Sequence, residues 1–192
     1  MNKDTIKEFF NGFASTWDNE PIADIEIINT ILDNANICEN IDVLDVGCGT
    51  GVMFPFYMER NTKSITAVDL SPEMAKIAKS KFSQADVICG DAETISFDNQ
   101  FDVIMIYNAF PHFPEPQKLI ENLAKYLKDG GRLCIAHGMS KKELDEIHMK
   151  SAGKVSNILP ECDELAEMLK PYFDVDIKIS NEEMYQVSGT KR

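Results

Sequence analysis

Residues 43–51 read VLDVGCGTG, an apolar run that contains one acid and ends at three closely spaced glycines. Such a run before a glycine-rich turn is typical of a buried β-strand and the loop that follows it in an open α/β sheet. Ligands of these sheets lie beyond the carboxyl ends of the strands. We therefore expect the turn to face a ligand, and the nature of that ligand decides the chemistry.

The spacing of the glycines distinguishes between nucleotide-binding motifs. Gly47, Gly49 and Gly51 form GxGxG, whereas the dinucleotide fingerprint GxGxxG requires a glycine where Val52 stands. The turn also lacks the Gly-Lys-Ser or Gly-Lys-Thr of a P-loop. This spacing argues against a nicotinamide-dependent oxidoreductase, which we keep as an alternative hypothesis.

Strand-like and helix-like segments alternate along the rest of the chain. The expected strands are residues 41–46, 64–69, 85–91, 101–108, 131–137, 172–180 and 183–189. Ser71 and Pro72 predict the N-cap and first residue of one helix, and residues 115–128 predict another that ends at Gly130. We expect an α/β, Rossmann-like single domain with a seven-stranded, mostly parallel sheet, an antiparallel C-terminal hairpin and helices on both faces.

The first 37 residues predict two amphipathic helices. One apolar stripe, rich in aromatic residues, runs at helical spacing from Ile6 to Trp17. Pro21 suits the first turn of the second helix.

Composition limits the partners. The 192 residues carry a formal charge of −13, and this negative field opposes binding to nucleic acid. No apolar run reaches the ~20 residues of a membrane span, and the N-terminus does not resemble a signal peptide, so we expect a cytoplasmic protein that does not bind membranes. Five cysteines without a CxxC pair signal neither a disulfide framework nor a metal site. Cys89 and Cys134 lie in strand-like runs, where we expect them to be buried.

Carboxylates stand on three of the expected strands, in or just after each. Asp45 precedes the glycine turn, and Asp69 and Asp91 end the second and third strands. An acid at the second strand end suits the two hydroxyls of a ribose, and one at the third can accept the exocyclic amine of an adenine. Without a phosphate-binding lysine, this pattern indicates an adenosine whose other half is not a phosphate.

With VLDVGCGTG, the segments AVDLSPEM, GDAE and FDVIMIYNAFPHFPEP make the chain resemble the class I methyltransferases that use S-adenosyl-L-methionine. The resemblance is to the small-molecule branch, similar to ubiquinone and menaquinone biosynthesis methyltransferases. It implies that the methionine moiety, ribose and adenine of the cofactor contact the following residues: Trp17, Asp45, Gly47, Cys48, Gly49, Gly51, Asp69, Leu70, Met74, Asp91, Ala92 and Asn108. No metal is implied.

The same resemblance divides the domain into functional segments. Residues 1–37 would cover the cofactor, 38–137 form the binding core, 138–160 form a substrate lid, and 161–192 form the terminal helix and hairpin. The lid contains several lysines, either a solvated face or a patch for an anionic group. Its limited length favours a small-molecule acceptor.

Catalytic residues are harder to identify from the sequence. His112 follows the fourth strand and is either a general base or a residue that holds its loop by a hydrogen bond; Asn108 is the other candidate. His137 and His148 face the same general direction, and His148 is expected at the surface for lack of a partner. A methyl group on a sulfonium is already activated, so alignment matters more than acid or base. A non-catalytic cofactor-binding regulator therefore remains a further alternative.

Overall fold

A computed structural model describes residues 1–19 and 24–192 of the chain. Pro21, expected in the first turn of the second helix, lies outside the described residues. The core is one seven-stranded sheet with the strand order β3-β2-β1-β4-β5-β7-β6. Strand β7 runs antiparallel to both of its neighbours and the other pairs are parallel, so the expected mixed sheet with a C-terminal hairpin is confirmed.

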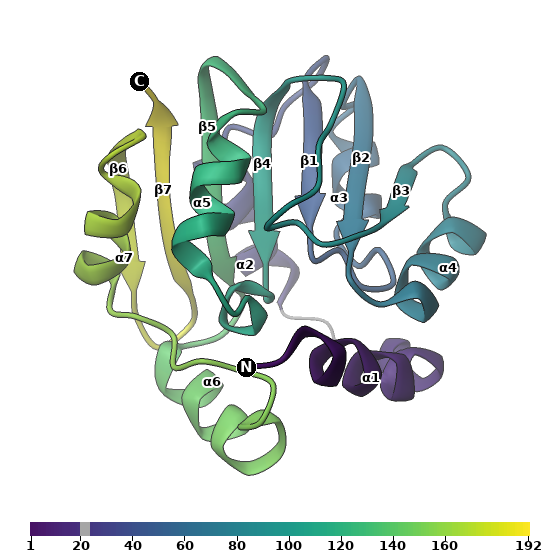
Figure 1. Ribbon diagram of the computed structural model, residues 1–192. Helices are drawn as coiled ribbons and strands as arrows, with labels where there is room; N and C mark the ends of the chain where they lie inside the picture. Colours follow the sequence, from purple (N-terminus) through teal and green to yellow (C-terminus); the bar gives the residue numbers. More distant parts are fainter. Residues whose placement is uncertain (20–23) are drawn as a thin grey trace.

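All strands except β5 begin and end within two residues of the predicted segments. They are β1 (Asp42–Val46), β2 (Ser64–Asp69), β3 (Asp86–Cys89), β4 (Phe101–Tyr107), β5 (Leu127–His137), β6 (Phe173–Ser180) and β7 (Tyr185–Lys191). In Figure 1 the arrows of β1 and β4 point to the lower edge of the sheet, where the loops after the parallel strands lie. The strand order reverses between β1 and β4, which creates the crevice expected for a ligand.

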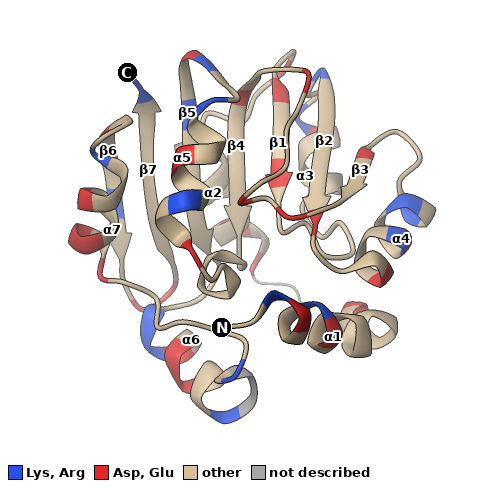
Figure 2. Cartoon of the chain, in the orientation of Figure 1, with Lys and Arg blue, Asp and Glu red and all other residues tan. Residues whose placement is uncertain are grey.

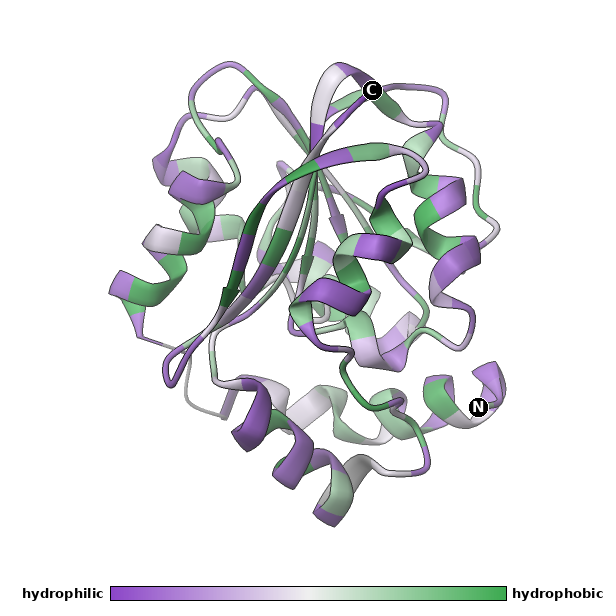
Figure 3. Cartoon of the chain, turned by 90° about the vertical axis from the view of Figure 1, so that its left-hand side faces the viewer, coloured by the Kyte–Doolittle hydropathy of each residue, from purple (hydrophilic) through white to green (hydrophobic). Residues whose placement is uncertain are grey.

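Helices cover both faces of the sheet (Figure 3). The helices are α1 (Lys3–Phe13), α2 (Ile25–Asn34), α3 (Phe54–Glu59), α4 (Pro72–Lys81), α5 (Pro116–Ala124), α6 (Lys141–Ile147) and α7 (Cys162–Leu169). Apolar residues of α2, α3 and α4 pack on one face, and those of α5 and α7 pack on the other. Helices α1 and α6 lie instead below the carboxyl edge of the sheet (Figure 1).

Local capping explains why α4 begins where it does. The side chain of Ser71 accepts a hydrogen bond from the backbone N–H of Met74, and Pro72 follows in the first turn. The loop between β2 and α4 is thereby fixed, as expected from the sequence. Pro55 is likewise accommodated in the first turn of α3.

The predicted boundary between α5 and β5 is wrong. The sequence pattern extends the helix to Lys128, but it ends at Ala124, and β5 already begins at Leu127. Leu127 pairs with Phe101 and is fully buried, which a further helical turn would prevent. Lys128 then lies near the start of β1 and binds the carboxylates of Asp42 and Asp102.

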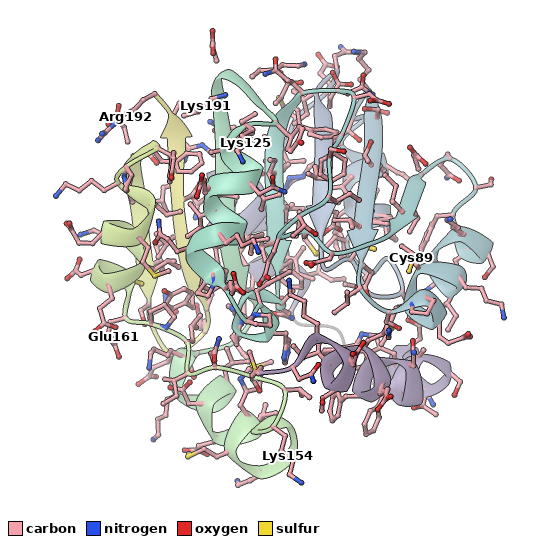
Figure 4. The ribbon with its side chains drawn as sticks, in the orientation of Figure 1. Cys89, Lys125, Lys154, Glu161, Lys191 and Arg192 are labelled. Carbon is pink, nitrogen blue, oxygen red and sulfur yellow. The ribbon has the colours of Figure 1, made fainter. Side chains whose placement is uncertain are left out.

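Two further expectations need correction. The α-helix at the N-terminus ends at Phe13, and a 3₁₀ helix, η1 (Ala14–Asn19), carries Trp17. Cys134 is buried as expected, but Cys89 is exposed. Cys89 ends β3, the short strand at the edge of the sheet, which has a neighbour on only one side (Figure 4).

Candidate cofactor and acceptor site

The glycine turn needs its glycines for two physical reasons. Gly47, Gly49 and Gly51 all have positive φ angles, of 73°, 54° and 87°, in the region that side chains disfavour. A Cβ on Gly47 would lie 2.7 Å from the Cβ of Ala109, and one on Gly51 would lie 2.9 Å from the ring of Phe54. A Cβ on Gly49 would meet the Trp17 Nε1 at 3.7 Å. Gly49 is therefore the least crowded of the three turn glycines.

Asp69 at the end of β2 joins two loops. Its Oδ2 accepts the backbone N–H of Gly49 and its Oδ1 accepts that of Ser71, both at 2.8 Å. Burial raises the pKa of Asp69, and the two backbone bonds oppose that rise. A carboxylate has about four lone-pair sites, so acceptor capacity remains for a ligand.

Asp45 in β1 is buried and incompletely bonded. Its side chain is 2% exposed, and Oδ2 has no hydrogen-bond partner among the described residues. Burial raises the pKa of Asp45 to about 7. The nearby Tyr57 hydroxyl opposes this rise, although its geometry does not meet that of a full hydrogen bond. The negative charge of Asp69 raises the pKa of Asp45 further. Cys48, next to the turn, is also buried, and burial raises the pKa of its thiol.

The loop after β3 already has a partner. Oδ2 of Asp91 accepts a hydrogen bond from Lys3 Nζ at 2.6 Å, and the same ammonium lies 2.5 Å from Oε2 of Glu93. Burial raises the pKa of Asp91, but the Lys3 bond and others outweigh it, so the net pKa is lowered. Three further residues that the sequence assigns to the adenine are buried or partly buried: Leu70, Met74 and Ala92.

Residues 1–19, here called the N-terminal strap, cross the carboxyl edge of the sheet (Figure 1). Three of its side chains bind the regions after three successive strands, each at 2.6 Å: Asp18 to Thr50 after β1, Asn11 to Ser71 after β2, and Lys3 to Asp91 after β3. The strap thus spans all three loops that the sequence assigns to the cofactor.

Aromatic rings extend the strap toward β4. The ring of Phe10 lies 5.7 Å from that of Trp17 and 4.9 Å from that of His112, in edge-to-face arrangements. Trp17 faces the turn at Gly49. Ile6 packs in a small cluster with Val155, so the strap meets residues 138–160 beyond the strand ends.

Asn108 and His112 follow β4. Asn108 has a φ of 52°, and its Oδ1 accepts the backbone N–H of Gly138 at 3.1 Å, which ties the ends of β4 and β5 together. Nδ1 of His112 lies 2.8 Å from the carbonyl oxygen of Val155, so this nitrogen carries the proton. Burial lowers the pKa of His112 to about 4, which makes it a poor general base; of the two roles left open, its geometry matches the loop-holding one.

The prediction that His148 is a partnerless surface residue is wrong. It begins the π-helical turn η3 (His148–Ala152), is half-buried, and its ring lies 5.1 Å from that of His112. His137, at the end of β5, is fully buried, and neither of its ring nitrogens has a hydrogen-bond partner among the described residues. The sequence placed His112 after the fourth strand but did not indicate its contact with His148.

The lid lysines do not form one free cationic patch. Lys141 Nζ binds Asp145 at 2.8 Å and Glu161 at 3.2 Å, so its charge is balanced within the chain. Lys154 lies at the lower tip of the lid, away from the strand ends (Figure 4). Acidic positions outnumber basic ones along the ends of β1 and β2 (Figure 2).

Two negative findings limit the chemistry of the described residues. Residues 1–19 and 24–192 contain no group of three or more His, Cys, Asp or Glu side chains arranged to hold a metal ion. None of the helices in these ranges has the length and apolar character needed to cross a membrane.

Comparison with known proteins identifies the family. Residues 44–135 match the family described as "Methyltransferase domain". The malonyl-[acyl-carrier protein] O-methyltransferase of Priestia megaterium is 31% identical over 97% of this chain and 76% of its own length. The ubiquinone biosynthesis O-methyltransferase of Coxiella burnetii is 27% identical over 84% of this chain and 74% of its own length.

Solved structures share the fold. The magnesium protoporphyrin IX methyltransferase of Synechocystis, solved with bound S-adenosylhomocysteine, superposes with a TM-score of 0.74 at 15% identity over all of both chains. The Haloferax volcanii complex between a methyltransferase and its Trm112 activator gives 0.80 at 17% identity over 97% of both chains. With the strand order, the glycine turn and the carboxylates at the strand ends, these likenesses show that the chain belongs to the class I S-adenosylmethionine-dependent methyltransferases, in their small-molecule branch.

Proposed function

We propose that this chain transfers the methyl group of S-adenosyl-L-methionine to a small-molecule acceptor by in-line displacement and releases S-adenosyl-L-homocysteine. The observation that carries the proposal is the N-terminal strap bound across the regions after β1, β2 and β3, where Asp69 binds the glycine turn and Asp91 binds the strap. Such a covered crevice suits a ligand that must be shielded from water during transfer.

The residues present fit the proposed ligand. Asp69 has acceptor capacity left for the two ribose hydroxyls, with its two backbone bonds fixing its orientation. Asp45 offers a buried oxygen without a partner among the described residues on the side of the glycine turn, where a cationic amino group would satisfy it. Gly49, the least crowded turn glycine, lets the backbone approach the methionine moiety.

Other residues complete the binding site in this proposal. Asp91 and Ala92 read the edge of the adenine, while Leu70 and Met74 flank it. Trp17 covers the turn from the strap, and Asn108 passes under the methionine end. Gly47, Gly51 and Cys48 shape the turn itself.

The proposed functional segments follow the same division. The strap lies within the cofactor-covering segment, residues 1–37, whereas the turn and the strand ends lie within the binding core, residues 38–137. Helix α6 lies within the lid, residues 138–160. Residues 161–192 complete the sheet with the terminal helix and hairpin.

S-Adenosylmethionine, when bound, supplies a methyl group activated by its sulfonium. The protein's residues then need mainly to align the acceptor and exclude water, because orientation removes much of the barrier. In this proposal Phe10 and Trp17 of the strap cover the cofactor, and the Asn108 bond to Gly138 holds the ends of β4 and β5 together. No strong base is needed for this role, which agrees with the low pKa of His112.

The class of acceptor is supported by charge, by size and by relatives. A charge of −13 disfavours nucleic acid, and the lid comprises only residues 138–160. Both relatives named above are O-methyltransferases, which supports oxygen as the methylated atom. One of them is named for a malonyl group on a carrier protein, so a carrier-bound acceptor belongs in the test. We place the activity in the cytoplasm.

Calorimetry with S-adenosylhomocysteine, followed by transfer of labelled methyl from S-adenosylmethionine to an acceptor library, tests the proposal. The library contains free hydroxyl, carboxyl, amine and thiol compounds and a malonyl carrier protein. Saturable binding with transfer to a free small molecule is expected. Binding without transfer favours the regulatory alternative, and binding of a nicotinamide dinucleotide instead favours the oxidoreductase.

A further inference from the structure

The chain has three histidines, and the structure brings all of them together. His112 lies in η2 (Phe110–His112) after β4, His137 at the end of β5 and His148 at the start of η3 in the lid. The rings of His112 and His148 are 5.1 Å apart. Burial lowers the pKa of His137, and the nearby His112 and His148 lower it further. We call these three residues the histidine cluster.

The cluster adjoins the methionine side of the proposed site. Asn108 binds the backbone N–H of Gly138, the residue after His137. Ala109, between Asn108 and His112, is the residue that crowds Gly47 of the glycine turn. Phe10 of the strap packs edge-to-face on His112. The cluster therefore lies at the carboxyl ends of β4 and β5, against Phe10 of the strap and next to the residues proposed for the methionine end of the donor.

Hydrogen bonding within the cluster is incomplete. Both ring nitrogens of His137, Nδ1 of His148 and Oδ1 of the neighbouring Asp145 are buried without a hydrogen-bond partner among the described residues. Buried polar atoms nearly always have a hydrogen-bond partner in folded proteins, so several without one in this region indicate that a polar ligand binds there. The His112 Nδ1 bond to Val155 leaves its Nε2 as an acceptor.

The chemistry of these atoms selects the ligand. A neutral imidazole has one donor nitrogen and one acceptor nitrogen, and a hydroxyl group likewise combines one O–H donor with an oxygen that accepts. A carboxylate would need donors alone and an ammonium acceptors alone. Asp145 does not add a free negative charge, because Lys141 binds its Oδ2 at 2.8 Å. The cluster thus matches an un-ionised hydroxyl better than an ion.

We propose that the histidine cluster is the acceptor subsite, with His137 as the residue that binds an un-ionised hydroxyl of the methyl acceptor. This assignment rests on the proposed function and narrows it to hydroxyl-bearing acceptors. His148 places the lid on the bound group, and His112 holds its loop through Val155. In this proposal the histidine cluster selects the chemical class of the acceptor, whereas the carboxylates at the strand ends bind only the methyl donor.

The test uses the full chain with ¹⁵N-labelled histidine, saturated with S-adenosylhomocysteine. Three probes of similar size are phenol, benzoate and benzylamine. We expect phenol to shift the ring nitrogen signals of His137 and His148 saturably, and to bind more tightly than the two ions. His137→Phe should weaken phenol binding at least tenfold, whereas His137→Asn, which keeps a donor and an acceptor, should restore most of it.

Controls separate this inference from the proposed function. The affinity of S-adenosylhomocysteine should stay within twofold in both His137 variants, because His137 does not contact the donor in this proposal. If S-adenosylhomocysteine fails to bind the unaltered chain, the proposed function fails. If it binds, but phenol leaves the His137 signals unchanged, binds His137→Phe equally well or is outcompeted by benzoate or benzylamine, only the hydroxyl subsite is overturned. The signals of the unaltered chain decide the matter even if His137→Phe does not fold.

Discussion

The backbone N–H of Gly49 donates a hydrogen bond of 2.8 Å to Oδ2 of Asp69, and this bond joins the turn after β1 to the end of β2. The other carboxylate oxygen binds the backbone N–H of Ser71 at the start of α4. One side chain therefore fixes two loops before any ligand is present. In our proposal the same carboxylate binds the ribose, so its removal should loosen the site as well as delete a contact.

Asp69→Ala should weaken binding of S-adenosylhomocysteine by about 2 kcal/mol or more, because a charged acceptor of two hydroxyls is lost. Asp69→Asn keeps one acceptor oxygen and should lose less. Calorimetry on the folded variants measures both. Equal affinity for Asp69→Ala and the unaltered protein would show that the ribose is held elsewhere.

Asp45 should make the ligand-free protein less stable as pH rises. Its pKa of about 7 in the folded state exceeds the ordinary value of 3.8. Between these two values the unfolded chain releases the proton and the folded chain keeps it, so the free energy of unfolding falls as pH increases from about 4 to about 7. A shift of about three units corresponds to at most ~4 kcal/mol.

Asp45→Asn removes this titration. Relative to the unaltered protein, we expect the variant to gain stability between pH 4 and pH 7 and then to remain at a constant difference. Denaturant unfolding across this range provides the measurement. Parallel stability curves for the two proteins would contradict the raised pKa of Asp45. The variant should also bind S-adenosylmethionine more weakly, because the charge opposite its amino group is lost.

Gly47 and Gly130 form a matched pair for testing the glycine turn. Both have a φ of 73°, but a Cβ on Gly47 meets Ala109 at 2.7 Å, whereas one on Gly130 has nothing within 4 Å among the described residues. Gly130→Ala should therefore cost only the backbone strain, about 1–2 kcal/mol. Gly47→Ala should cost ~1–3 kcal/mol more through the clash. Equal losses in thermal or denaturant unfolding would mean that Ala109 moves aside freely.

The sequence was sufficient where local rules decide the structure. The glycine turn after β1, the N-cap at Ser71 and the C-terminal hairpin follow from residue types and short-range spacing. Parallel strands bring their carboxyl ends to one edge, which is why Asp45 and Asp69 could be placed together.

Long-range partners could not be predicted in the same way. Lys3 and Asp91 are 88 positions apart, and nothing in either segment indicates that they meet. The contact of His148 with the ring of His112 joins segments that are far apart in the sequence, and nothing in either segment indicates it. The early start of β5 depends on the pairing of Leu127 with Phe101, which overrides the helical preference of the preceding segment.

Lys3 should control closure of the N-terminal strap. Its ammonium binds Asp91 and the buried Glu93, whose side chain is 0% exposed. Lys3→Met leaves Glu93 without this charged partner, so the strap should detach more often from the loop after β3. Because the Lys3 side chain is itself 31% exposed, solvent screens the pair and the expected loss of stability is about 1 kcal/mol.

Lys7→Met is the control for this prediction. Lys7 lies on the same helix and, among the described residues, binds only the exposed Asp4. Its replacement therefore removes one positive charge from α1 but keeps the Lys3 contacts with Asp91 and Glu93. Hydrogen exchange of α1 should be faster in Lys3→Met than in Lys7→Met, and addition of S-adenosylhomocysteine should reduce the difference because the bound ligand holds the strap against the strand ends. Identical exchange in the two variants would show that the aromatic contacts of Phe10 and Trp17 hold the strap in place without the lysine.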